Sequence, residues 1–261
     1  MSFNILREDE GGSTNKWVKR KDAVLNMLYV NDPAVIGLQE CSWTIRQDIL
    51  ADDSNRSAIG VSVSGQENGY TKESSNTIIY RNDLLEVLDD GTFWLSSTPD
   101  KVSNTWGNAN KPRTCTWAKF KMKNSPAKSF YVFNLHIESD ADVLDRIKAL
   151  KVVHNQIKDK NHDNIPVIIT GDHNDTESDL ELGYVGSSFT SARSASSVTV
   201  TDTGATLNGW GKDYDSSTDV VIDHIYTKNC IPKAFYVDRS RYNGRVYISD
   251  HYPVYCDLTI N

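Results

Sequence analysis

Three Asp-His dipeptides contain half of the six histidines in the chain, and they are Asp172-His173, Asp223-His224 and Asp250-His251. Carboxylates hold hard divalent cations and position water, and imidazole exchanges a proton near neutral pH. Successive side chains of a strand face opposite ways, so within a strand only one member of a dipeptide reaches a shared site. For Asp250-His251, the nearby Gly244 and Pro253 indicate a turn in which both side chains point inward. These residue types indicate metal-assisted or acid–base chemistry.

The first dipeptide follows the strongest strand signal in the chain. Residues 166–170 form a run of apolar and β-branched residues without alternation, which is typical of a strand buried on both faces. If the chain stays extended beyond Gly171, Asp172 and Asn174 point to one side and His173 to the other. A carboxylate beside an amide is suited to positioning a water against an electrophile. An Asx-type turn after a core strand is the alternative interpretation.

Polar side chains also follow other predicted strands. The full set is Asn4, Glu40, His136, Asp172 with Asn174, Asp223, and Asp250 with His251. A single polar residue in such a place is usually a hydrogen-bonded core group. Six strand ends that all carry polar residues favour a shared site instead.

The predicted elements are those of an α/β protein. Apolar spacing predicts helices over residues 16–29, 44–50 and 140–160. Strand patterns fall at 2–6, 34–38, 59–63, 77–80, 84–88, 114–122, 130–137, 166–170, 220–226, 233–237 and 252–260. The βαβ-like opening favours a sandwich of strands with helices outside. The chain has neither an internal repeat nor a linker, so residues 1–261 are expected to form a single domain.

Composition narrows the range of partners. A net charge of −7 and a pI near 5.4 attract no polyanion in general, so nucleic-acid binding would need a local patch or a bound cation. No apolar run of about 18 residues is present to span a membrane. Residues 2–6 form a strand pattern rather than a signal peptide, although so early a strand leaves an upstream segment open. The four cysteines are isolated, which favours free thiols, and we expect a cytoplasmic monomer.

A basic stretch and two tryptophans each have two interpretations. Residues 101–137 contain no Asp or Glu but seven Lys or Arg. Three of these lysines alternate with apolar residues, namely Lys119, Lys121 and Lys123. The alternation favours a solvated face that guards a sheet edge over a phosphate-attracting patch, whereas Arg113 lies outside it and stays open.

Trp106 and Trp210, in Gly/Asn-rich loops, would either cap the core or form an aromatic rim that stacks on a base.

Six short motifs carry a family resemblance. They are Ser2-Phe3-Asn4-Ile5, Ile36-Gly37-Leu38-Gln39-Glu40, Asn134-Leu135-His136, Gly171-Asp172-His173-Asn174, Ile222-Asp223-His224-Ile225 and Ser249-Asp250-His251-Tyr252-Pro253-Val254. In this order they resemble the endonuclease/exonuclease/phosphatase superfamily, and residues 91–100 and 112–117 resemble its bacterial branch near the deadenylase and nocturnin group. The resemblance implies an α/β fold, a four-layer α/β sandwich in which two mixed β-sheets pack face to face with helices on both outer faces.

The resemblance also implies a Mg²⁺ site, with Mn²⁺ as a substitute, at the ends of the sheets. Glu40 matches the principal metal ligand of the family, with Asn4 and Asp250 nearby in the metal shell. Asp172 matches the residue that orients or deprotonates the attacking water, and Asn174 matches its positioning partner. Carboxylates that hold a hard cation beside a water are what such an attack requires.

The remaining matches concern the phosphate. His251 matches the histidine that touches the scissile phosphate, and Asp223 matches the carboxylate that orients it. His136 matches a second phosphate-binding or acid histidine. Arg113 is a weaker match that would bind substrate, and Trp210 would bind substrate by stacking, which is not a family match. A carboxylate beside His251 would fix its tautomer and raise its pKa, so that the ring stays a donor to phosphate.

Three positions are weaker matches or depart from the family pattern. Glu73 is a weaker match, as a partner of His136. His173 stands where the family usually has an apolar or aromatic residue, and strand alternation predicts that it is buried and hydrogen-bonded away from the site. Ile248 stands where relatives often carry proline, which leaves the path of that loop open.

The sequence predicts a Mg²⁺-dependent phosphoesterase that cleaves phosphodiesters or phosphomonoesters by metal-assisted in-line attack of water. Its partner would be a phosphate ester, either nucleic acid, as for a nuclease, or a phosphorylated small molecule. The alternative is a catalytically silent binding module on the same fold. Such a module would lack a metal or water-positioning residue, and no expected residue is missing.

Overall fold

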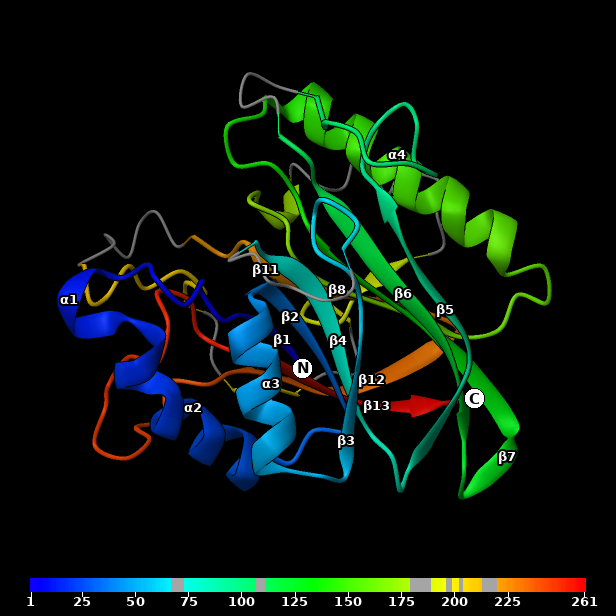
Figure 1. The fold of residues 1–261 in the computed structure, drawn as a ribbon. Coiled ribbons are helices and arrows are strands. Elements are labelled where there is room, and N and C mark those ends of the chain that lie inside the picture. Colours follow the sequence, from blue (N-terminus) through cyan, green and yellow to red (C-terminus); the bar gives the residue numbers. More distant parts are fainter. Residues whose placement is uncertain (67–72, 107–110, 179–188, 196–198, 202–203, 213–219) are drawn as a thin grey trace.

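The computed structural model describes residues 1–66, 73–106, 111–178, 189–195, 199–201, 204–212 and 220–261. Two β-sheets pack face to face, and helices cover their outer faces (Figure 1). Each sheet contains both parallel and antiparallel neighbours. The predicted four-layer sandwich of mixed sheets is therefore confirmed.

The first sheet joins the N-terminal strands to strands from the C-terminal part of the chain. Its strand order is β10 (Thr199–Val200), β12 (Cys230–Val237), β13 (Val254–Ile260), β1 (Ser2–Asn4), β2 (Val35–Cys41), β4 (Ser75–Arg81) and β3 (Arg56–Ile59). The helices that follow β1 and β2 are α1 (Gly12–Asn15), α2 (Trp17–Asn31) and α3 (Trp43–Asp52). Apolar residues of α2 and α3, among them Met27 and Ile45, pack against Phe3 and Ile36 of the sheet. This packing fixes the outer face of the strands that lead to Asn4 and Glu40.

The second sheet carries the central strand signal. Its strand order is β5 (Leu85–Trp94), β6 (Thr114–Met122), β7 (Ser125–His136), β8 (Val167–Asp172), β11 (Asp223–Lys228) and β9 (Thr190–Ser191). Helix α4 (Val143–Lys160) covers its outer face, with Leu150 and Val153 packed against Phe133 (Figure 1). The helix starts later than predicted because the Asp142 side chain accepts a hydrogen bond from the Asp145 amide and caps it.

Three strand predictions are displaced. The strand predicted at 220–226 lies at Asp223–Lys228, so Asp223 begins β11 instead of following the apolar run at 220–222. The strand predicted at 59–63 lies at Arg56–Ile59, because Gly60 takes a φ of 123° and ends it. The strand predicted at 84–88 continues to Trp94 as β5, since backbone pairing with β6 does not require apolar side chains. Residues 175–193, where the sequence favours a loop with a short helix, lie mostly outside the described residues.

The strand that carries Lys119 and Lys121 was expected to guard a sheet edge, and this expectation is wrong. β6 lies between β5 and β7, and β5 is the edge strand. Two of the lysines have partners on the same sheet, since Lys121 pairs with Glu86 at 2.7 Å and Lys119 lies over the Tyr131 ring. The solvated-face interpretation holds for these lysines, but their role is cross-strand pairing rather than protection of an edge.

A polar contact between the sheets sets their spacing near the site. The buried Asn134 of β7 accepts from Gln39 at 2.7 Å and donates to the Leu38 carbonyl of the first sheet at 2.8 Å. Gly37 faces this contact, where an added methyl group would overlap Thr170 Oγ1 and lie 2.6 Å from Asn134 Oδ1. The absence of a side chain at this position lets β2 approach β7 and β8 closely.

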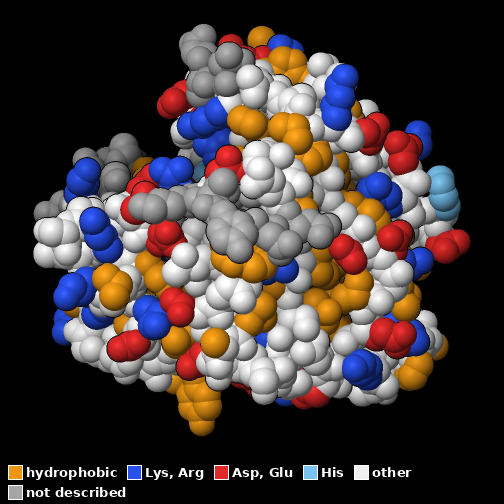
Figure 2. Space-filling model, viewed as in Figure 1, with side chains coloured by type: hydrophobic (Ala, Val, Ile, Leu, Met, Phe, Trp, Pro, Cys, Tyr) orange, Lys and Arg blue, Asp and Glu red, His pale blue; other side chains and the backbone are white. Residues whose placement is uncertain are grey.

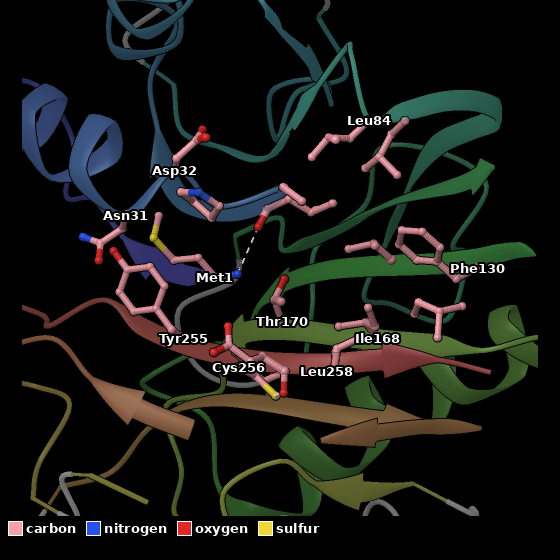
Figure 3. A pocket seen from close by; sticks show the side chains of 18 of the residues that line it. Met1, Asn31, Asp32, Leu84, Phe130, Ile168, Thr170, Tyr255, Cys256 and Leu258 are labelled. Carbon is pink, nitrogen blue, oxygen red and sulfur yellow. Dashed lines mark hydrogen bonds between the residues drawn. The ribbon is translucent and has the colours of Figure 1, made fainter. Parts of the chain in front are cut away.

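An apolar cavity of about 420 Å³ lies between the sheets at the end where β1 and β2 begin (Figure 3). Phe130, Ile168 and Leu258 line it, and the Met1 amino group beside it donates to the Val35 carbonyl at 3.0 Å. None of the site residues predicted from sequence lines this cavity. The chemistry therefore belongs to the other end of the sandwich, where the same strands finish.

Two predictions about the chain as a whole can be compared with the structure. All four cysteines are free thiols, as expected from their separation. Among the described residues, no helix is both long and apolar enough to cross a membrane.

Candidate active site

Six chain segments bring their polar residues together at one end of the sandwich. The contributing positions are the end of β1, the end of β2, the ends of β7 and β8, the start of β11 and the turn before β13. β1 runs parallel to β2, and β7 runs parallel to β8. Because Asn4 at the end of β1 donates to Asp172 at the end of β8, both pairs finish on the same side. β11 is antiparallel to β8 and pairs Asp223 with Asp172. The sheet topology thus turns residues scattered along the chain into one cluster.

Asp172 is the centre of this cluster. Its buried Oδ2 accepts a hydrogen bond from Asn4 Nδ2 at 2.9 Å, and the same oxygen lies 3.4 Å from His136 Nε2 and 3.7 Å from His251 Nε2. Burial raises the pKa of Asp172 to about 7; the neighbouring His251 charge lowers it, and the Asp223 charge adds to the rise. A carboxyl group with a pKa near neutrality can accept a proton from water.

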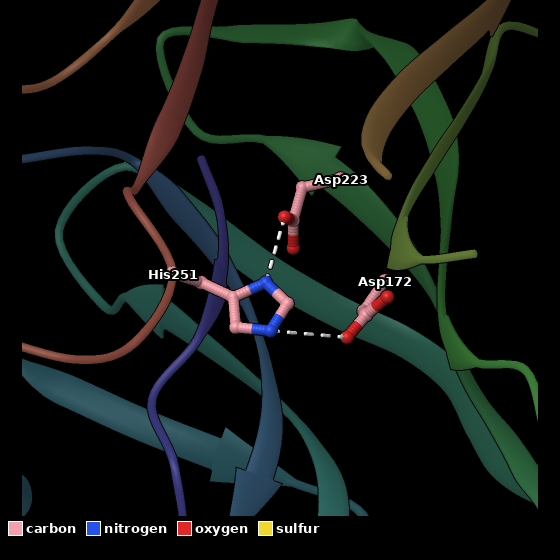
Figure 4. Close-up of side chains that lie close together, drawn as sticks. All are labelled: Asp172, Asp223 and His251. Carbon is pink, nitrogen blue, oxygen red and sulfur yellow. Dashed lines mark hydrogen bonds and ion pairs between the residues drawn. The ribbon is translucent and has the colours of Figure 1, made fainter. Parts of the chain in front are cut away.

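His251 lies between two carboxylates (Figure 4). Its Nδ1 donates to Asp223 Oδ2 at 2.8 Å, and its Nε2 faces Asp172. Burial alone would lower the pKa of His251, but the charges of Asp223 and Asp172 outweigh it and raise the pKa to about 10. The ring is therefore a cation at neutral pH. Thr206, which sequence reasoning missed, anchors this arrangement by accepting from the Asp223 amide at 3.0 Å.

His136, unlike His251, is neutral. Burial lowers its pKa well below the usual range, and the positive charges of Arg113 and His251 lower it further. Asn174 Nδ2 donates to His136 Nε2 at 3.1 Å and to the Ile137 carbonyl at 2.9 Å. The strand ends at Asp172, whose Oδ1 accepts from the Asn174 amide at 3.0 Å, so the chain forms the Asx-type turn that was the alternative to an extended path. A neutral imidazole keeps a single N–H, so His136 differs from His251 in its charge and in its number of donors.

The expected metal residues meet around Asn4. Asn4 Nδ2 donates to Glu40 Oε1 at 3.2 Å as well as to Asp172, while its own oxygen accepts from the Leu6 amide at 3.1 Å. Asn4 therefore joins the two carboxylates through its NH₂ group, and its oxygen is directed elsewhere. Glu40 takes a φ of 58° at a break in the register between β2 and β4, which turns its side chain out of the regular pleat.

The acidic residues fit a hard divalent cation. Glu40 is half-buried, and Asp250 Oδ1 lies 3.2 Å from Ser249 Oγ. Carboxylate oxygens such as these are the ligands that Mg²⁺ and Mn²⁺ prefer. Asp172, Asp223 and His251 also have ligand atoms within 4.8 Å of one another. Glu40 and Asp250 add two further carboxylates on the other side of Asn4 and Ser249.

The weaker sequence candidates lie further out. Arg113 pairs side-on with the buried Glu138, at 3.2 Å from Nε and 3.4 Å from Nη2. Glu138 was not predicted, although it follows His136 by two residues. Glu73 accepts hydrogen bonds from Ser62 and Ser64 instead of pairing with His136.

The two tryptophans differ in their surroundings. Trp106 packs against the core beneath α4, which confirms the core-capping interpretation for that residue. Trp210 takes a φ of 66°, and its amide donates to Asn208 Oδ1 at 2.9 Å. The Asn208 amide in turn donates to the Asp250 carbonyl at 2.7 Å. Trp210 is thus tied to the loop that carries Asp250 and His251.

His173 is buried away from the site, as alternation predicted. Its Nδ1 lies 3.1 Å from the Gly171 carbonyl, and its ring meets the His224 ring edge-on at a centroid distance of 5.3 Å. The second members of two Asp-His dipeptides therefore pack together behind the sheet, while their aspartates face the cluster.

A family model described as "Endonuclease/Exonuclease/phosphatase family" matches residues 1–251. The chain belongs to the endonuclease/exonuclease/phosphatase family. The activities in the family's name all cleave phosphate esters, so the family is one of hydrolases. Among curated proteins, the uncharacterized protein L388 of Acanthamoeba polyphaga mimivirus is 25% identical over 182 residues, which is 67% of this chain and 66% of that protein.

Solved structures of family proteins share the fold. An endonuclease/exonuclease/phosphatase from Bacteroides vulgatus is 27% identical with a TM-score of 0.89, covering 100% of this chain and 97% of that one. The mannosyl-6-phosphatase Bt3783 of Bacteroides thetaiotaomicron is also 27% identical, with a TM-score of 0.85 and coverage of 99% and 98%. The human Nocturnin catalytic domain, at 17% identity, has a TM-score of 0.73 with coverage of 99% and 93%, which shows the shared fold.

Proposed function

We propose that this family member is a Mg²⁺-dependent phosphoesterase that hydrolyses its substrate by in-line attack of water. The observation that supports this proposal most directly is the position of Asp172. One buried carboxylate accepts from Asn4, which also binds Glu40, and faces both His136 and His251. A proton acceptor, a cationic donor and an acidic cation site are thereby adjacent.

We assign each residue a role that follows from its charge. Asp172 accepts the proton of the attacking water, and Asn174 positions that water together with the neutral His136. The cationic His251 donates hydrogen bonds to the phosphoryl oxygens, where negative charge develops. Asp223 keeps His251 protonated and oriented. Glu40 and Asp250 would hold a Mg²⁺, which when bound would offset the negative charge that develops during hydrolysis.

For the substrate we propose a phosphorylated small molecule in preference to nucleic acid. On the face shown in Figure 2, Lys and Arg are interspersed with Asp and Glu rather than gathered into a basic stripe, and the net charge is −7. One structural neighbour is named a mannosyl-6-phosphatase, so its name gives a phosphorylated sugar as its substrate. Arg113 and Trp210 are the residues that we propose contact the substrate beyond the phosphate.

The test is hydrolysis by the wild-type protein with and without Mg²⁺. The substrates are p-nitrophenyl phosphate, bis(p-nitrophenyl) phosphate, hexose phosphates and single-stranded and duplex DNA. We expect Mg²⁺-dependent turnover, fastest on phosphomonoesters. Glu40→Ala and His251→Ala should each lower kcat/KM by about 10²–10⁴-fold, whereas His162→Ala, at an exposed histidine, should not.

Three outcomes would contradict parts of the proposal. Metal-dependent turnover on none of these substrates would favour a silent binding module. Full activity in Glu40→Ala or His251→Ala, with the fold intact by circular dichroism, would exclude the assigned roles. Faster hydrolysis of DNA than of any small phosphate would replace the proposed substrate class by a nuclease.

A further inference from the structure

Arg20 is a fully buried arginine near the start of α2 with no role in the chemistry described above. Its guanidinium has five N–H donors, and all five meet main-chain carbonyls. The acceptors are the carbonyls of Ile5, Leu6, Arg7, Asn15 and Ile248. Complete satisfaction by carbonyls from three separate segments is unusual for a buried charge, which is more often paired with a carboxylate.

Two of these segments carry expected metal residues. Ile5 to Arg7 directly follow Asn4, and Ile248 precedes Asp250 by two residues. Leu6 takes a φ of 59°, which is unfavourable for a leucine and must be held by its surroundings. A single guanidinium therefore fixes the turn after Asn4 against the loop that carries Asp250, and Ser249 Oγ adds a hydrogen bond of 2.7 Å to the Asn4 carbonyl.

The charge of Arg20 also acts on the acidic cluster. Burial lowers the pKa of Arg20 to about 10, while the charges of Asp250 and Glu40 raise it, so the side chain remains a cation at neutral pH. Glu40 and Asp172 accept from the same Asn4 nitrogen, so these two carboxylates lie close together, and like charges at short range repel one another before a metal binds. A permanent cation behind these residues offsets that repulsion.

We propose that Arg20 is a positioning residue that preorganises the divalent-cation site, by locking the Asn4 and Asp250 segments together and by offsetting their acidic charge. The inference rests on the proposed function only in that this site binds a divalent cation. Arginine is suited to the task because its planar fork reaches both segments at once. Lysine keeps the charge but has only three donors on one atom.

The test compares Arg20→Lys with Arg56→Lys in Mn²⁺ binding to the metal-free protein at pH 7, measured by titration calorimetry without substrate. Arg56 is the matched control, since it is also buried and bonded to the Pro33 carbonyl, Asp32 and Asp53, but at the opposite end of the first sheet. We expect Arg20→Lys to weaken Mn²⁺ binding by about 10–100-fold, as loss of a group that holds ligands in place does. Arg56→Lys should bind within about twofold of wild type.

Arg20→Lys that binds Mn²⁺ as tightly as wild type would overturn the positioning role and leave the proposed function standing. A wild-type protein that takes up no Mn²⁺ would overturn both. If Arg20→Lys does not fold, hydrogen exchange in the metal-free wild type replaces it. Protection of the amides of residues 5–7 and 249–251 supports preorganisation, whereas protection that appears only after Mn²⁺ is added overturns it.

Discussion

At the residue scale, charge state separates two histidines that look alike in sequence. His136 and His251 both lie within 4 Å of Asp172. His251 also has Asp223 at hydrogen-bond distance and is cationic, whereas His136 has Arg113 nearby and is neutral. The carboxylate that orients His251 is therefore also what keeps it a donor.

This charge state predicts the pH dependence of kcat/KM. Activity should rise as Asp172 loses its proton near pH 7 and fall as His251 loses its proton near pH 10. A bound cation should move the acidic limb of this profile to lower pH. Asp223→Asn removes a charge that raises the His251 pKa. We expect the alkaline limb in that variant to move down by about one to three pH units.

The measurement is a pH–rate profile at saturating Mg²⁺. Asp257→Asn, which changes an exposed carboxylate far from the site, serves as the control and should keep both limbs. An alkaline limb that stays in place in Asp223→Asn would show that Asp223 does not set the charge of His251.

At the element scale, departures from regular strand geometry aim the side chains. Glu40 and Asn174 both take positive φ angles, of 58° and 50°, at or just beyond strand ends. Gly37 has a different role, because it leaves room for Thr170 and Asn134 from the facing sheet. The strands that carry Glu40 and Asp172 can approach each other only because that space is empty of a side chain.

Gly37→Ala should therefore force the sheets apart. We expect the free energy of unfolding to fall by about 1–3 kcal/mol, as for overpacking in a core, and kcat to fall with it. The nearest atom belongs to Thr170, so the cost of Gly37→Ala should be smaller in a Thr170→Ala background. Urea unfolding of the four proteins of this cycle tests the point, and an equal cost in both backgrounds would argue against it.

At the scale of the whole molecule, the site lies between two sheets that come from different parts of the chain. Cation binding there should stabilise the entire fold, because only the folded chain brings Glu40 and Asp250 together. After EDTA treatment, Mg²⁺ or Mn²⁺ at about 100 times its Kd should add about 2.7 kcal/mol to the free energy of unfolding. This gain appears as a higher midpoint in a thermal melt.

Glu40→Gln should lose most of that stabilisation. Glu86→Gln, which changes a surface glutamate paired with Lys121, should retain it. A Glu40→Gln protein that gains as much stability from the cation as wild type would place the cation elsewhere in the molecule.

The sequence by itself determined which residues stand at strand ends, because strand and helix periodicity are local properties. β6 was predicted to the residue, and His173 was predicted to face away from the site. The family was also visible in the sequence, since its motifs keep their order and neighbours.

Only the tertiary structure decided the charge states and contacts of the site. The neutral His136, the NH₂ bridge of Asn4 and the pairing of Arg113 with Glu138 all depend on burial by segments remote in sequence. Arg20 belongs to none of the sequence motifs, and its five carbonyl partners lie in three segments of the chain. Long-range packing sets such features, and no local pattern encodes them.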